Sequence, residues 1–285
     1  MSPRKRVEPP EELKSVAKAW GLLKLFTAQK CRWSVAEMVK ALGYHESSVR
    51  RVVDTLECEG VLERVAADQR TYKLGPRLLA LAHVAALDND LQQTARPHLE
   101  RLAQQTQETA HFCVVDQNQC YYLDKIDTPH SIRIVTHVGQ RLPLHCTGVG
   151  KALMSGMDER EIDQIIAACG LPGFTPNTIT DRLRLLEELE QIRKEGLSYD
   201  REEFEIGLRC LAAPVKDASG RVVAAVSISG PSQRITPEVI PQLAQEVKQA
   251  ALEISTRLGY RSPTSRNNPK IKNPRPRSSW SILLD

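Results

Sequence analysis

The sequence predicts an α+β fold of two domains, an N-terminal winged helix-turn-helix and a larger body in which helices cover a mixed sheet. Two observations support this. Residues 34–74 carry, in order, two amphipathic helices separated by a tight turn and then two short alternating strands. From residue 110 onward, runs with the two-residue period of strands give way to helical spacing and then return. At 285 residues the chain has room for two domains.

The helix-turn-helix is predicted from residues 34–60, where Gly43 supplies the permissive backbone of the turn. The two apolar stripes are Val35, Met38, Val39 and Leu42, and then Val49, Val52, Val53 and Leu56. The other face of the second helix carries hydroxyl and charged groups, which are Glu46, Ser47, Ser48, Arg50 and Arg51. Such a face suits phosphates and base edges in a major groove, because Arg can bridge O6 and N7 of guanine.

A β-ribbon follows directly after Gly60, with a predicted turn at residues 66–70 that places Arg70 at the tip and Lys73 at the base. For the two helices alone, a helical hairpin with a solvated charged face is the alternative interpretation. The ribbon behind them favours a wing and DNA binding. The predicted DNA contacts are Ser34, Glu46, Ser47, Ser48, Arg50, Arg51, Arg70 and Lys73.

The charge is distributed unevenly along the chain. Residues 1–80 hold 15 Lys and Arg against 10 Asp and Glu, which gives +5. Residues 81–260 hold 18 against 24, a balance of −6, and residues 261–285 hold 6 against 1, again +5. A basic head on an acidic body predicts a polyanion partner for the head alone.

The sequence predicts a cytoplasmic protein, since it contains neither a signal-peptide pattern nor an apolar run long enough to span a membrane. The seven cysteines never form a C-x-x-C pair and are expected to be reduced thiols, with no disulfide framework and no zinc site. They are Cys31, Cys58, Cys113, Cys120, Cys146, Cys169 and Cys210.

Helices are predicted on both sides of the winged motif. A first helix is expected to cap the head core with Val16, Ala19, Leu22, Leu23 and Phe26. Behind the wing, Gly75-Pro76 opens a helix whose apolar surface predicts a packed connection and a dimer contact. That surface comprises Leu78, Leu79, Leu81, Ala82, Ala85 and Ala86. Another helix is predicted to begin at Pro97.

The body is predicted to contain both strands and helices. The expected strands are residues 111–115, 121–126, 131–135, 211–215 and 222–229, and the expected helices are 150–155, 159–168, 181–194 and 237–258. The predicted boundaries are a flexible N-terminus at 1–12, the winged domain at 13–75, a linker helix at 76–92, the body at 93–260 and a disordered basic tail at 261–285.

Three stretches of the body carry polar chemistry. Residues 144–151 form a glycine-bearing loop that runs into a helix, a start suited to a small anion. Residues 199–210 hold charged groups, and strand period places Ser227 and Ser229 on one face of the last strand. Structural roles are the alternative, with the serines as hydrogen-bonded filler and Cys210 as a small core residue.

Over about residues 13–259 the chain resembles the isocitrate lyase regulator (IclR) family of bacterial transcription factors. The resemblance rests on LGYHESSVRRVVDTLECEGVLER, YKLGPRLLALA, LHCTGVGKALM, YDREEFEIGLRCLAAPV and VVAAVSISGP. It implies a GAF-like effector domain that binds organic acids. The implied effector contacts are Gly148, Val149, Asp200, Leu208, Cys210, Ser227 and Ser229, with Ile134 and Leu142 as apolar walls. Val149 stands where family members with small acid ligands commonly have Ala, which disfavours effectors of glyoxylate size.

The resemblance implies a regulator whose affinity for a pseudo-palindromic double-stranded DNA operator is set by a small organic acid, aromatic acids included. A two-fold dimer or a tetramer is expected to present the paired recognition helices. No cofactor or metal and no membrane contact is expected. Two other classes remain open, an architectural DNA-binding protein without a ligand and an enzyme. The enzyme would use His145 and Cys146 with His111, His137 and Cys210 as a thiol nucleophile and base or as a metal site.

Overall fold

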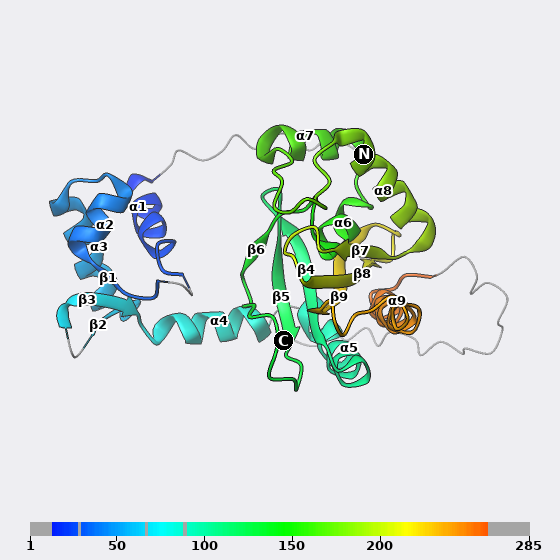
Figure 1. Ribbon diagram of the computed structural model, residues 1–285. Helices are drawn as coiled ribbons and strands as arrows, with labels where there is room; N and C mark the ends of the chain where they lie inside the picture. The colour runs from blue at the N-terminus through cyan, green and yellow to red at the C-terminus, as the bar shows by residue number, and fades with distance from the viewer. Residues whose placement is uncertain (1–12, 28–29, 66–67, 88–89, 262–285) are drawn as a thin grey trace, which may run out of the picture. The chain divides into compact units, whose positions relative to one another are not determined.

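The structure is a computed structural model that describes residues 13–27, 30–65, 68–87 and 90–261 (Figure 1). The chain forms two compact units, Met1–Asp90 and Leu91–Asp285, here called the head and the body. The predicted flexible N-terminus and all but the first residue of the predicted disordered tail lie outside the described residues. The α+β class and the N-terminal winged helix-turn-helix are confirmed.

The head is a three-helix core with a small antiparallel sheet of strand order β1-β3-β2. Its elements are α1 Lys14–Leu23, β1 Trp33–Ser34, α2 Val35–Leu42, α3 Glu46–Cys58, β2 Leu62–Val65, β3 Asp68–Leu74 and α4 Arg77–Leu87. Strand β1 was missed because it is only two residues long. It exists because Trp33 pairs with Tyr72 of the wing.

Local side-chain and backbone signals fix both ends of α2 in the head. Ser34 and Glu37 form a capping box at the start of α2, and Gly43 ends that helix with a left-handed φ of 67°. The buried core comprises Leu22, Met38, Val49, Val53, Leu62 and Tyr72. Hydrophobic burial of this stripe, worth about 1.5–3 kcal/mol for each large side chain, holds α2 and α3 together.

Three details of the head differ from the sequence-based expectation. Strand β3 begins at Asp68, which pairs with Val65 of β2, so residues 68–70 of the predicted turn belong to the strand. Helix α1 ends at Leu23, and Phe26 packs on the core from beyond the helix. Val16 was expected to face the core, but it is 62% exposed.

Helix α4 carries a conspicuous apolar surface. Leu79, Leu81 and Val84 are 75%, 63% and 62% exposed in the single chain. These side chains are therefore not packed within the single chain, and the dimer contact expected of this helix stays a prediction. Ala85 and Ala86 were also predicted to belong to this apolar surface, but their side chains are not among those that the structure describes.

The body is built on a six-stranded sheet of order β6-β5-β4-β9-β8-β7. Its strands are β4 Thr109–Asp116, β5 Gln119–Ile126, β6 Arg141–Leu142, β7 Ser198–Arg201, β8 Leu208–Lys216 and β9 Val222–Pro231. The predicted mixed sheet is wrong, since every pairing between the described strands of this sheet is antiparallel. Strands β6 and β7 were missed because they are short edge strands.

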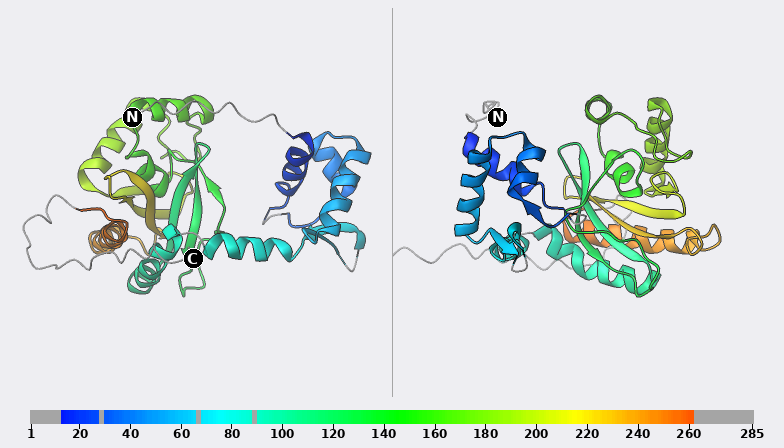
Figure 2. Two further views of the ribbon diagram at one scale, coloured as in Figure 1. Left: turned by 180° about the vertical axis from the view of Figure 1, so that it is seen from behind. Right: turned by 60° about the vertical axis from the view of Figure 1, so that its left-hand side comes forward.

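Helices cover both faces of this sheet (Figures 1 and 2). The helices are α5 Asp90–Thr106, α6 Gly148–Met154, α7 Glu159–Cys169, α8 Arg182–Glu195 and α9 Ile240–Arg257. Helices α5 and α9 pack on one face around Phe112, Val226 and Ile228. Helices α6, α7 and α8 pack on the other face around Ala212 and Ala225. Because side chains alternate along a strand, polar residues on this second face lie between the sheet and α6.

Two expectations for the body are wrong. Residues 131–135 were expected to form a strand, but they pair with no strand in the described chain, and side chains satisfy nearby carbonyls instead. Arg234 donates to Ile132 O at 3.1 Å and Lys125 donates to Thr136 O at 2.8 Å. Pro97 was expected to begin a helix, but it lies on the exposed side within α5. Burial of Ala95 and Leu99 offsets the cost of a proline there.

Candidate functional site

The predicted DNA-binding residues lie on α3 and β3 of the head, with Ser34 on β1 as the N-cap of α2. Glu46 and Arg50 form an exposed ion pair at 2.8 Å on the first turns of α3, and Ser47 and Arg51 are exposed beside them. A surface ion pair of this kind contributes about 0–1 kcal/mol to stability, so Arg50 can readily leave Glu46 and bind another acceptor.

The other predicted contacts already have partners within the head. The Ser34 hydroxyl serves the capping box of α2, and Lys73 lies 3.5 Å from Glu63 on the neighbouring strand. Arg70 is exposed on β3. Ser34 therefore has a structural role that the sequence prediction did not weigh.

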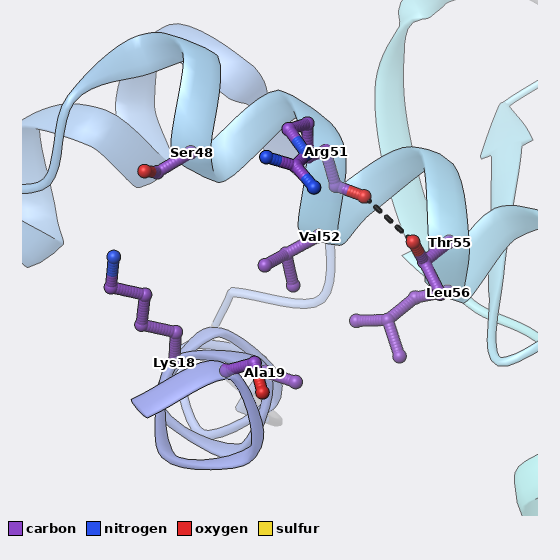
Figure 3. A pocket seen from close by; sticks show the side chains of 8 residues that line it. Lys18, Ala19, Ser48, Arg51, Val52, Thr55 and Leu56 are labelled. Atoms are coloured by element: carbon purple, nitrogen blue, oxygen red, sulfur yellow. Dashed lines mark hydrogen bonds between the residues drawn. The ribbon is translucent and has the colours of Figure 1, made fainter. Parts of the chain in front are cut away.

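An open groove of about 340 Å³ lies between α1 and α3 (Figure 3). Its apolar floor is formed by Ala19, Val52 and Leu56. Lys18 and Arg51 extend over it together with hydroxyl groups, and the Thr55 hydroxyl donates to Arg51 O at 2.8 Å. The lining comprises Ser15, Lys18, Ala19, Ser48, Arg51, Val52, Thr55 and Leu56. Two cations with hydroxyl donors suit a phosphate. Lys18 was missed because it precedes the recognized motif.

All nine predicted effector residues line one cavity of about 90 Å³ in the body. They come from segments far apart in the sequence, namely Ile134, Leu142, Gly148, Val149, Asp200, Leu208, Cys210, Ser227 and Ser229. The cavity also has lining residues that the sequence did not single out, which are Tyr122, Val135, Thr136, Gln140, Thr147, Phe204 and Glu205.

Sheet register explains why the polar residues meet. Asp200 pairs with Cys210, and Cys210 pairs with Ser229, so one row of side chains crosses β7, β8 and β9. A second row, two residues along β9, joins Ser227 to His111 of β4. Opposite residues of antiparallel strands point to the same face, so both rows face the cavity side. A contiguous sequence pattern cannot show this convergence.

The loop before α6 closes one side of the cavity. Thr147 caps α6, accepting the Gly150 N–H at 3.1 Å. A Cβ on Gly148 would lie 2.9 Å from the Cys210 sulfur, so glycine is required for this close approach. The Gly148 and Val149 amides begin the helix and have no acceptor within it, which leaves them available as hydrogen-bond donors.

Burial shapes the charge of the cavity. Desolvation raises the pKa of Asp200 to about 7, although the Glu203 amide, which donates to Asp200 Oδ1 at 2.7 Å, opposes this. Glu203 in turn binds the fully buried Lys151 at 2.6 Å, and Glu188 shares that ammonium at 3.1 Å. Asp200 and Glu205 thus give this end of the cavity an acidic lining.

The side chains considered for an enzyme do not form a reactive set. Burial raises the pKa of Cys146 and of Cys210 to about 12, so both thiols are protonated near neutral pH. His145 Nε2 bonds Pro172 O at 3.0 Å, and the pKa of His111 falls to about 3 through burial. Within the described ranges, no three His, Cys, Asp or Glu side chains cluster as a metal site.

Comparisons with known proteins match both parts of the chain. The family model described as "Bacterial transcriptional regulator IclR C-terminal" matches residues 83–256, and the "IclR helix-turn-helix domain" matches residues 15–66. The Escherichia coli K12 regulator KdgR is 32% identical over 251 residues, which are 88% of this chain and 95% of KdgR.

Solved structures agree with these sequence matches. The Thermotoga maritima IclR crystal structure is 31% identical, with a TM-score of 0.72 over 87% of this chain and all of that one. An IclR homologue from Microbacterium hydrocarbonoxydans, crystallized with 4-hydroxybenzoate, is 25% identical with a TM-score of 0.77, covering 86% and 98% of the two chains. With a helix-turn-helix head and a C-terminal ligand-binding fold that both match, the chain belongs to the IclR family of bacterial transcriptional regulators.

Proposed function

We propose that the head binds a double-stranded DNA operator and that a small organic acid in the body cavity controls its affinity. One observation carries the second half of this proposal. Nine residues spread between positions 134 and 229 line one cavity, and Ser227 among them is 1% exposed, with no hydrogen-bond partner for its Oγ in the described chain beyond the weak Cys210 thiol. A buried hydroxyl without a partner is costly, by about 1–3 kcal/mol, and a ligand oxygen would remove that cost.

The size of the cavity favours a small aliphatic acid, against the expectation that Val149 disfavours effectors as small as glyoxylate. About 90 Å³ equals the share of roughly three water molecules in the liquid. The 4-hydroxybenzoate bound by the relative supports an acid as the ligand class. An aromatic acid is too large unless the cavity widens. Residues 134–136 form an irregular wall that belongs to no strand, so we expect this segment to move when the cavity widens.

The DNA half of the proposal uses α3, the wing and the α1/α3 groove. Arg50 and Arg51 are assigned to the operator, and Lys18 to a phosphate beside them. Exposed Leu79, Leu81 and Val84 on α4 support a two-fold dimer with a pseudo-palindromic operator, or a tetramer built from such dimers. A cytoplasmic location follows from the DNA partner. None of the described helices is long and apolar enough to cross a membrane.

The effector acts by favouring one arrangement of the dimer. It changes operator affinity only by its difference in affinity for the two arrangements. The sequence is compatible with repression and with activation. Isothermal calorimetry of the full chain with a panel of aliphatic and aromatic acids, beside gel shifts with operator DNA, tests the proposal. Binding of an acid that changes operator affinity supports it. Operator binding that no acid alters, with no acid bound, contradicts it in favour of an architectural protein.

A further inference from the structure

The effector cavity has two chemically different ends. The first end lies at β7, where Asp200 and Glu205 line the wall. The second lies toward β4 and β5, where Tyr122, Thr136 and Ser227 line it. Strands β7 and β9 are separated by β8 alone, so their backbones are about 10 Å apart. No carboxylate lines the cavity at the second end.

Two buried polar atoms without partners mark the second end. His111 Nδ1 and Ser227 Oγ have no hydrogen-bond partner in the described chain, and their residues face each other across β4 and β9. Cross-strand partners have Cβ atoms about 5 Å apart, so rotation of the serine hydroxyl can bring the two groups together. The Cys210 thiol also lies within hydrogen-bond reach of Ser227, but a protonated thiol is a weak partner.

The surroundings of His111 fix its chemical form. Its ring stacks on Tyr122 with centroids 4.3 Å apart, and its Nε2 lies 2.9 Å from the Thr136 hydroxyl. Burial and the nearby Lys125 lower the pKa of His111, whereas Asp127 opposes them, so the ring is neutral. If Thr136 donates to Nε2, the single ring proton is on Nδ1, which then donates toward Ser227.

Electrostatics decide which end takes a carboxylate. The loop amides of Gly148 and Val149 offer donors, but Gly148 packs against Cys210, whose ladder partner is Asp200. A carboxylate there would lie near Asp200, Glu203 and Glu205, with Lys151 already shared by two glutamates. At the other end Lys125 lies behind Thr136, donating to its carbonyl at 2.8 Å and pairing with Asp127 at 2.8 Å. Glu205 lines the Asp200 end and no carboxylate lines the Ser227 end, so repulsion between like charges favours the ligand carboxylate at the Ser227 end.

We propose that the cavity binds a hydroxy-carboxylic acid in one orientation, with the carboxylate on Ser227, His111 behind it and the ligand hydroxyl donating to Asp200. The inference rests on the effector cavity of the proposed function. His111 is a positioning residue. Its Nδ1–H donates to Ser227 Oγ, so that the serine O–H is free to donate a hydrogen bond to the ligand carboxylate. Asp200 is the residue that distinguishes hydroxy acids from plain acids.

The experiment measures binding of matched acids by calorimetry on the full chain. The pairs are 4-hydroxybutyrate with butyrate, and 4-hydroxybenzoate with benzoate. Wild type is expected to prefer the hydroxylated member by about tenfold, as for a hydrogen bond to a charged group. Asp200→Asn should reduce that preference severalfold. Asp116→Asn, which alters an exposed carboxylate paired with Arg141, serves as the matched control and should keep the preference.

Two further variants test the carboxylate end. Ser227→Ala and His111→Phe should each weaken both members of a pair by a similar factor, with the phenylalanine keeping the stack on Tyr122. The double variant should lose no more than Ser227→Ala alone, since His111 acts through the serine. A purely structural role for His111 predicts additive losses instead.

The outcomes separate this inference from the proposed function. If Asp200→Asn strengthens both members of a pair equally, or if wild type shows no hydroxyl preference, the orientation is wrong while the effector cavity stands. If none of the four acids binds wild type, the acid-effector assignment itself is contradicted, and the orientation with it.

Discussion

Asp200 carries a carboxyl group into the interior of the body, where it is 3% exposed. Burial raises its pKa from 3.8 to about 7. In the folded protein the group therefore holds its proton between about pH 4 and pH 7, whereas in the unfolded chain it has lost it. The native state binds more protons over this range, so its stability falls as the pH rises through the folded-state pKa.

Asp200→Asn should remove this pH dependence. The amide oxygen can still accept the Glu203 N–H, but no buried charge forms above pH 7. We expect the stability of the variant relative to wild type to grow by about 3 kcal/mol between pH 5 and pH 7 and to level off above pH 7. Chemical denaturation of both proteins across this range measures the difference. A gap in unfolding free energy that does not grow with pH would show that Asp200 is not buried as a carboxyl group.

At the residue scale, the sequence indicated which residues line the cavity better than it indicated which side chains contact one another. The nine effector residues were named from sequence, through the resemblance to a family, and the structure gathers them in one cavity. Tyr122 and Thr136 were not named, and His111 was named only for a possible enzyme, because their place beside Ser227 depends on strand register and on an irregular wall. Ser34 was named for DNA, yet its hydroxyl caps α2.

At the scale of the element, β9 supplies the two serines of the cavity. Ser227→Ala and Ser229→Ala should each weaken effector binding by about 0.5–3 kcal/mol, the range from neutral to charge-assisted hydrogen bonds. Operator binding without effector should stay near wild type. Calorimetry measures the first effect and gel shifts the second. If the double variant binds effector normally, the hydroxyls only fill the sheet face. Loss of operator binding in the absence of effector would assign them to the fold or to the dimer.

Helices α1 and α3 allow a graded test of the DNA interface. Arg50→Ala and Arg51→Ala should lower specific operator affinity by about 1–3 kcal/mol where a bidentate base contact is lost. Lys18→Ala should weaken binding to all sequences alike and reduce the salt slope by about one, as for a single phosphate contact. Affinities for operator and scrambled DNA at several salt concentrations distinguish these results. Normal operator binding by both arginine variants would remove α3 from the interface.

Element types were predictable where periodicity was strong, as in α2, α3, β4 and β9. The failures have physical causes. Residues 131–135 are rich in β-branched side chains, but strand formation also needs a partner edge, and Lys125 and Arg234 take the nearby carbonyls instead. Pro97 is a local helix breaker whose cost is offset by the buried face of α5. Short edge strands such as β7 have too few residues to show a period.

At the scale of the whole molecule, the question is how formation of a dimer through α4 would affect binding of the head to DNA. Leu79 and Leu81 of α4 are apolar yet more than 60% exposed, which disfavours α4 as an isolated solvent-facing helix. A partner chain that covers them would place two copies of α3 on one two-fold operator. We therefore expect oligomeric state and DNA affinity to be linked through this surface.

Leu79→Glu combined with Leu81→Glu should shift the protein toward smaller assemblies and reduce affinity for a two-half-site operator more than for a single half-site. The reason is that a charge must be desolvated where the apolar contact formed, while α3 itself is unchanged. Sedimentation equilibrium measures the assembly, and gel shifts on both DNA lengths measure the affinity.

The matched control is Leu183→Glu, which alters another exposed leucine, on α8 of the body. An unchanged assembly with unchanged operator affinity in the α4 variant would mean that this helix does not form the dimer contact. A changed assembly with equal losses on both DNA lengths would mean that the dimer does not align the two recognition helices.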